Sequence, residues 1–268
     1  MQHYKYLPIL LLSFLSTQVI CQPLTSKTAK QPTQLVWSDE FNYQGLPDST
    51  KWNYDIGGWG WGNNELQYYT KAALSNARVG EGVLTIELKK ENIGDNKYSA
   101  ARLVTKGKGD WIYGRIDVRA KLPKGLGTWP AIWMLGSTNP LKWPDDGEID
   151  IMEHVGYNPG VVHATVHTKS FNHIIGNQKT NTIAVPDFDT QFHVYSVIWN
   201  QDSVSILLDD TSYYSFNNRG TGKDAWPFDG PMHLLLNIAF GGNWGGKEGI
   251  DESILPAKME IDYVRVYQ

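Results

Sequence analysis

The sequence predicts a single all-β domain, a sandwich of two β-sheets that can bend so that its concave face forms a long groove. Three observations support this fold class. Segments of strand length recur along the chain, and several alternate apolar and polar residues with a period of two. The chain contains 11 tryptophans, 14 tyrosines and 26 glycines, and aromatic residues favour strands while glycine serves turns and bulges. No segment keeps a helical period over about twelve residues.

Eight segments are expected to form the main strands. Glycine, asparagine, aspartate and proline, which are typical of turns, separate them from one another. The segments are residues 83–88, 113–122, 148–154, 161–168, 192–200, 203–208, 232–240 and 258–267.

The composition excludes several functional classes. Apolar residues make up 41% of the chain and charged residues 19%, which is enough for a core and too little charge for a disordered protein. The formal net charge is −4. Because a polyanion is held by a basic excess that this chain lacks, we expect no nucleic-acid partner.

Residues 1–21 predict a secretory signal peptide. A short basic start precedes an apolar run over residues 7–15, which is too short to cross a membrane. Cleavage after Cys21 would give a secreted protein, extracellular or periplasmic. The alternative is a lipoprotein signal in which Cys21 carries a lipid anchor, although the bulky residue before it argues against this. Residues 22–33 are expected to form a polar linker.

Three acidic residues, Glu148, Asp150 and Glu153, lie on one apolar predicted strand. In a regular strand Glu153 would point away from the other two, because the side chains alternate between faces. One extra residue between Asp150 and Glu153 would correct this, and β-bulges of that kind are common near active sites. The bulge would leave Ile149 and Ile151 for the core. Neighbouring carboxylates raise each other's pKa, as a general acid at neutral pH requires.

Two other interpretations of these acids stay open. They could form the polar outer face of an edge strand, or a metal cluster, although histidine partners at a suitable spacing are missing.

The tryptophans favour a carbohydrate site over these alternatives. Sugar rings have apolar faces and polar edges, which flat aromatic rings and hydrogen-bonding side chains match. Tryptophans in glycine-rich loops have few local packing partners and are expected at a surface, whereas Trp37, Trp52 and Trp199 are expected in the core. The expected surface group is Trp59, Trp61, Trp129, Trp133, Trp143 and Trp244.

The run GEIDIME from Gly147 resembles the catalytic signature of glycoside hydrolase family 16 in its bulged form. Five further runs are similar to motifs of the laminarinase branch of that family. They are NNELQYY from Asn63, YGRIDVRAKLP from Tyr113, WPAIWML from Trp129, GGNWGG from Gly241 and DYVRVY from Asp262. The resemblance extends from about Trp37 to Gln268. It implies a concanavalin-like β-jelly roll of two curved antiparallel sheets, a catalytic domain over residues 34–268, and retaining hydrolysis of a β-linked glucan.

The resemblance also implies roles for individual residues. Glu148 would be the nucleophile and Glu153 the general acid/base, with Asp150 between them and hydrogen-bonded to the nucleophile. The two working carboxyls of a retaining pair lie roughly 5–5.5 Å apart. The residues implied to contact sugar are Asn64, Arg102, Trp129, Trp133, Trp143 and His167. His163 and His167 share a strand face, and a structural role for one of them stays open.

The resemblance further implies one structural calcium ion on the face opposite the cleft, while catalysis would need no cofactor. The implied ligands are Glu40, the carbonyl of Gly82, and Asp262. Calcium takes six to eight oxygen ligands, many of them from the main chain or water, so two acids suffice. The alternative is that these are two surface acids that never meet a metal.

The bulged signature covers laminarinases, agarases and carrageenases. The NNELQYY run and the neutral tryptophan-rich loops favour an endo-acting β-1,3-glucanase that also accepts mixed-linkage β-1,3-1,4-glucan, because a sulfated galactan calls for clustered basic residues. The alternatives are an agarase- or carrageenase-like galactan hydrolase and a non-catalytic glucan-binding jelly roll, which usually lacks one of the two glutamates. We expect a monomer with no protein partner.

Overall fold

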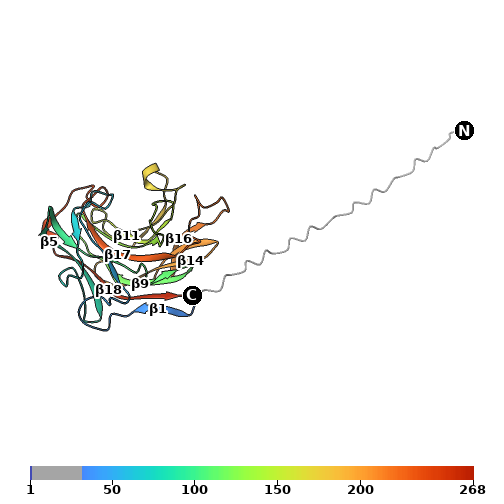
Figure 1. The fold of residues 1–268 in the computed structure, drawn as a ribbon. Coiled ribbons are helices and arrows are strands. Elements are labelled where there is room, and N and C mark those ends of the chain that lie inside the picture. Colours follow the sequence, from blue (N-terminus) through green and yellow to red (C-terminus); the bar gives the residue numbers. More distant parts are fainter. Residues whose placement is uncertain (2–31) are drawn as a thin grey trace. The chain divides into compact units, whose positions relative to one another are not determined.

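The structure is a computed structural model that describes Met1 and residues 32–268, and in the latter range the chain folds into two β-sheets (Figure 1). Sheet A has ten strands in the order β16-β15-β14-β9-β18-β5-β6-β3, with β1 beside β18 and β4 beside β5. Its strands are β1 (Leu35–Asp39), β3 (Gln67–Tyr69), β4 (Ala77–Gly80), β5 (Val83–Ile93), β6 (Asn96–Ala100), β9 (Gly114–Lys121), β14 (His193–Trp199), β15 (Ser203–Leu208), β16 (Thr211–Asn217) and β18 (Ala257–Tyr267).

Sheet B has eight strands within residues 32–268. The order is β13-β12-β11-β10-β17-β7-β2, with β8 beside β17. Its strands are β2 (Asn53–Asp55), β7 (Arg102–Val104), β8 (Asp110–Trp111), β10 (Thr128–Gly136), β11 (Glu148–His154), β12 (Val161–His167), β13 (Lys179–Ala184) and β17 (Met232–Phe240). Figure 1 shows β11 and β17 in one layer and β9, β14 and β18 in the other. Two single turns of 3₁₀-helix, η1 (His173–Ile175) and η2 (Glu252–Ile254), lie in the connections.

The predicted all-β sandwich is confirmed, and all eight predicted strands are present. Strands β11, β15 and β17 have the predicted bounds, because clear period-two or apolar runs end at turn residues. The pairing is antiparallel with one exception, the parallel pair of β3 and β6. The predicted signal peptide and most of the predicted linker lie outside the described residues. No helix within the described part of the chain is long and apolar enough to cross a membrane.

Strand β10 corrects one expectation. Trp129 and Trp133 do not lie in a loop, because the run around them forms a central strand of sheet B between β11 and β17. Proline and glycine around this run hide the strand pattern from the sequence. Ile132 and Met134 alternate with the tryptophans and are fully buried between the sheets.

The core fills the space between the two sheets and includes large aromatic side chains. Trp52 and Trp199 are each 1% exposed, and Trp37 packs against the same cluster, as expected. Each such ring removes about 150–250 Å² from water, which is worth several kcal/mol at about 25 cal/mol per Å². All nine residues of β17 are buried. This packing makes sheet B a rigid support for the side chains on its outer face.

Candidate active site

The acids of β11 share one face of the strand because of a bulge. Asp150 pairs with Thr165 of β12 and Glu153 pairs with His163, so three residue steps on β11 oppose two on β12. Strand β10 shows the same shift on the other side. The intervening Ile151 is fully buried. The predicted bulge is therefore present, and Glu148, Asp150 and Glu153 all face outward from sheet B.

The three acids line a cleft of about 400 Å³ on the outer face of sheet B. Four residues predicted to contact sugar also line it, namely Arg102, Trp129, Trp133 and Trp143. Other lining residues are Trp59, Trp61, Gly62, Asn63, Glu65, Ala131, Leu135, Leu141, His173, Ile174, Asn237 and Ala239.

Two predicted contacts, Asn64 and His167, are not among the residues that line the cleft. Asn64 is exposed, and its amide donates a hydrogen bond to Asn243 at 2.8 Å. Its neighbour Asn63 lines the cleft instead. His167 is buried on β12 beside the acids.

Each glutamate accepts a hydrogen bond from the indole N–H of a tryptophan. Trp143 Nε1, in the connection before β11, donates to Glu148 Oε2 at 2.7 Å. Trp129 Nε1, on β10, donates to Glu153 Oε1 at 3.0 Å. The two glutamates lie near opposite ends of β11, and the indole hydrogen bonds fix the orientation of both carboxyl groups.

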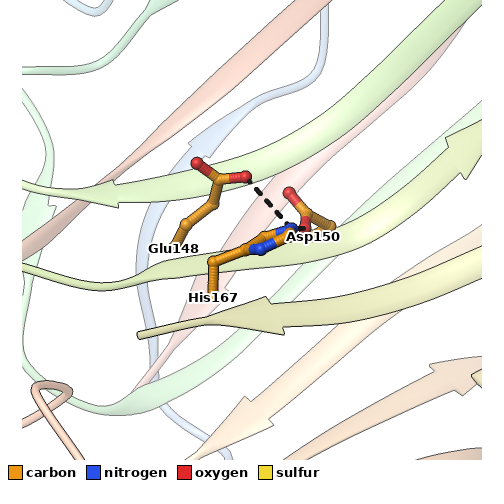
Figure 2. Close-up of side chains that lie close together, drawn as sticks. All are labelled: Glu148, Asp150 and His167. Carbon is orange, nitrogen blue, oxygen red and sulfur yellow. Dashed lines mark ion pairs between the residues drawn. The ribbon is translucent and has the colours of Figure 1, made fainter. Parts of the chain in front are cut away.

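His167 lies against the Glu148 side of the cluster (Figure 2). Its Nε2 is 3.3 Å from Asp150 Oδ2 and 3.7 Å from Glu148 Oε1. His163 is the partner of Glu153 in the strand register, and its ring packs edge-on against Trp244. Of the two histidines that the sequence left open, the structure brings His167 to the carboxylates of Glu148 and Asp150.

Burial raises the pKa of all three carboxyls. Their removal from water is the largest cause in each case, and the nearby charge of Asp150 raises the pKa of Glu148 and of Glu153 further. The side chains of Glu148 and Asp150 are 15% and 3% exposed. Because the three groups disfavour one another's charge, the cluster holds fewer than three negative charges at neutral pH.

Glu148, Asp150 and His167 can also hold a metal ion. One ligand atom from each lies within 4.8 Å of the other two. The sequence around the acids does not reveal this set of ligands, because His167 lies on the neighbouring strand β12. The alternative interpretation of the acids as part of a metal site is therefore supported by a nearby histidine that the sequence pattern does not indicate.

The residues implied to bind calcium lie elsewhere. Both oxygens of Glu40 accept hydrogen bonds from Arg265, at 2.9 and 2.8 Å, and Asp262 accepts one from Arg119 at 2.5 Å. Carboxylates and the carbonyl of Gly82 are suitable ligands for a hard cation. A calcium ion there would have to replace these two ion pairs, so the site stays a prediction.

A hydrogen-bonded chain behind Trp133 was missed by the sequence analysis. Trp133 Nε1 donates to Asn237 Oδ1 at 2.7 Å, and Asn237 Nδ2 donates to the Tyr69 hydroxyl at 3.0 Å. That hydroxyl donates to Glu65 Oε2 at 3.3 Å. Asn237 is the polar residue in the otherwise apolar middle of β17, which is a signal that the sequence does contain.

The family model for glycosyl hydrolases family 16 matches residues 63–265. The chain belongs to this family. It is 54% identical to a β-glucanase of Rhodothermus marinus over 264 residues, which is 95% of this chain and 92% of that protein.

Solved structures of family members resemble the fold. The laminarinase of Rhodothermus marinus has a TM-score of 0.86 at 54% identity, covering 89% of this chain and 99% of that one. A non-specific endo-β-1,3(4)-glucanase of the family, with 1,3-β-D-cellobiosyl-glucose at its active site, has a TM-score of 0.85 at 48% identity. The match covers 88% of this chain and 94% of that one. The two-sheet sandwich is thus the jelly roll of this family.

Proposed function

We propose that this chain is a retaining endo-β-1,3-glucanase that hydrolyses laminarin-type β-glucan and also accepts mixed-linkage β-1,3-1,4-glucan. The observation that carries the proposal is the pair Glu148 and Glu153 on one face of β11, each bound by an indole N–H within an aromatic cleft. The cleft suits sugar rings, because its aromatic walls match their apolar faces. The names of the related β-glucanase and laminarinase support the choice of substrate.

In the first step of the proposed mechanism, Glu148 attacks the anomeric carbon and Glu153 protonates the leaving glycosidic oxygen. The bond to the leaving sugar breaks as the bond to Glu148 forms. Asp150 lies between the two on the same strand face, and its charge raises the pKa of Glu148. When Asp150 is protonated its charge no longer raises the pKa of Glu148, so Glu148 ionises more readily and is able to attack.

In the second step Glu153, now ionised, takes a proton from the water that attacks the glycosyl-enzyme. This releases the sugar with its original configuration and returns both glutamates to their first states. The first-formed product is therefore expected to be the β-anomer, which proton NMR of a fresh digest detects before mutarotation. An α-anomer would exclude Glu148 as nucleophile and require an inverting scheme.

The substrate is tested by product analysis on laminarin, mixed-linkage glucan, agarose and carrageenan side by side. We expect release of reducing ends from laminarin to exceed that from either galactan by at least about 100-fold, because hydrogen-bonding sites discriminate strongly between sugars. Equal or greater activity on agarose would favour the galactan hydrolase. Binding of laminarin without hydrolysis would favour the non-catalytic glucan-binding module.

Two further properties belong to this proposal. The predicted signal peptide over residues 1–21 supports export of the enzyme. A calcium ion held by Glu40, Gly82 and Asp262 would join the segment after β1 to the last strand and stabilise the fold. A ligand that binds only the folded state adds about 2.7 kcal/mol at a hundredfold excess over its dissociation constant.

The calcium proposal is tested with a chelator. Chelation should lower the melting temperature and leave the turnover of the folded enzyme unchanged. Loss of turnover at a temperature where circular dichroism shows an intact fold would instead place a metal at Glu148, Asp150 and His167.

A further inference from the structure

A row of stacked side chains lines the cleft and begins beside the acids. Trp133 is the neighbour of Asp150 across strands β10 and β11. The guanidinium carbon of Arg102 lies 4.6 Å from the ring centre of Trp133 and 4.7 Å from that of Trp61. The ring of Trp61 in turn lies 4.0 Å from that of Trp59. Trp59 is thus the end of the row, and the row connects it to Asp150 through Trp61, Arg102 and Trp133.

Arg102 holds this row together. Two indole rings cover its guanidinium, and its Nε lies 3.0 Å from Asp55 Oδ2. Its side chain is 10% exposed. Cation–π contacts are worth about 0.5–2 kcal/mol each, with the larger values at desolvated sites. Arg102 therefore has little surface left for a sugar and acts mainly by positioning Trp61 and Trp133.

Trp59 is held in place by its neighbours but is largely exposed to solvent. The residue is 68% exposed, although it lines the cleft. The ring lies directly over Gly57, where a Cβ atom would come within 2.0 Å of a Trp59 ring carbon. The carbonyl of Gly57 accepts a hydrogen bond from Trp61 Nε1 at 3.1 Å, which ties the two rings to the same piece of backbone. A rigid, solvent-facing indole is an apolar surface that water does not favour and that a ligand can cover.

We propose that Trp59 is the outermost sugar platform of the cleft and gives the enzyme a preference for long glucan chains. This inference rests on the proposed function and extends it to chain length. A glucan whose reacting bond lies at Glu148 and Glu153 reaches Trp59 only if it extends past Trp133 and Trp61. Long chains gain a stacking contact there, while short substrates end before it.

The experiment compares kcat/KM on long β-1,3-glucan oligosaccharides with kcat/KM on an aryl β-glycoside of a short β-1,3-linked sugar. For Trp59→Ala we expect the ratio of the long to the short substrate to fall about tenfold, the effect of one lost aromatic contact of about 1.4 kcal/mol. Trp59→Phe should restore part of the ratio, because it keeps a ring over Gly57. Leu74→Ala is the matched control, since Leu74 is 55% exposed and does not line the cleft.

Equal losses on both substrates, or an unchanged ratio, would overturn the role of Trp59. A binding assay separates this result from failure of the proposed function. Affinity electrophoresis in laminarin gels compares Glu148→Gln with the double variant Glu148→Gln/Trp59→Ala. If the unmodified enzyme cleaves no β-1,3-glucan, the proposed function fails. If it cleaves laminarin but the double variant binds as tightly as Glu148→Gln, only the Trp59 proposal fails.

Discussion

Glu148 and Glu153 lie on the same strand face, and each accepts one indole hydrogen bond, but the charges around them differ. Glu148 has His167 Nε2 at 3.7 Å, and the charge of Asp150 raises its pKa. Glu153 is paired with His163 across the two strands, and burial lowers the pKa of His163. One glutamate therefore has the His167 imidazole beside it, and the other is paired in the strand register with a ring on which burial disfavours a positive charge.

This difference indicates which carboxyl ionises first. Burial raises the pKa of both glutamates, and His167 and one indole hydrogen bond lower each of them. Burial and the charge of Asp150 together raise the pKa of Glu148 to about 8, whereas the charges of both Asp150 and Glu148 add to burial in raising the pKa of Glu153. A carboxyl whose neighbours favour its charge suits a nucleophile, and one that keeps its proton suits a general acid. The surroundings thus support the assignment of roles that the family resemblance implies, on physical grounds of their own.

The largest expected effect is that of Glu148→Ala. This change removes the attacking group, so no glycosyl-enzyme forms, and activity should fall by at least about 10⁴-fold whatever the leaving group. Hydrolysis of laminarin and of an activated aryl β-glucoside measures it, with far-UV circular dichroism as the control for folding. Residual activity that depends strongly on the leaving group would contradict the assignment.

Glu153→Ala should impair the enzyme differently, because its effect should depend on the leaving group. Loss of the proton donor should lower hydrolysis of laminarin by about 10²–10⁴-fold. An activated aryl β-glycoside leaves without a proton, so its first step should survive and the glycosyl-enzyme should accumulate. Azide can then enter the space of the lost carboxyl and give a β-glycosyl azide, which NMR identifies. An α-azide from Glu148→Ala, with no rescue of Glu153→Ala, would mean that the two roles are exchanged.

The sequence predicts the chemistry of β11 well because that information is local. The spacing of Glu148, Asp150 and Glu153 leads directly to the bulge, since only an inserted residue places all three on one face. The main strands are predictable for the same reason, because their period-two patterns are set by neighbours in the chain.

The parts of the site that the sequence misses depend on contacts between distant segments. The pairing of β11 with β12 brings His167 next to the acids. Arg102 of β7 packs against the ring of Trp61, which lies in a loop. The Tyr69 hydroxyl bonds both Glu65 and Asn237, although Asn237 lies 168 positions after Tyr69 in the chain. No pattern within one segment contains such information. Strand β10 is missed for a local reason, because proline and glycine obscure its alternation.

The two indole hydrogen bonds sharpen the comparison. Hydrogen bonds to charged groups contribute about 1.5–3 kcal/mol, so Trp143→Phe and Trp129→Phe should each lower kcat/KM by about 10–150-fold. Each bond lowers the pKa of its own glutamate. Removing the Trp143 bond should therefore move the acidic limb of the pH–rate profile to higher pH, while removing the Trp129 bond moves the alkaline limb to higher pH. Movement of the same limb in both variants would contradict the separate roles.

The smallest expected effect comes from the two histidines, which form a matched pair on one face of β12. A positive charge near a carboxyl favours its ionised form, and a change of one pKa unit alters the ionised fraction about tenfold below the pKa. His167 lowers the pKa of Glu148 and of Glu153, so His167→Gln should shift both limbs to higher pH and lower kcat/KM on laminarin about tenfold at pH 5.

His163→Gln provides the control, because burial disfavours the charged form of His163, and its ring packs against Trp244 rather than pairing with an acid. It should leave both limbs of the profile in place, even if the melting temperature falls. Comparable shifts of the acidic limb in both variants would show that the charge near Glu148 does not come from His167.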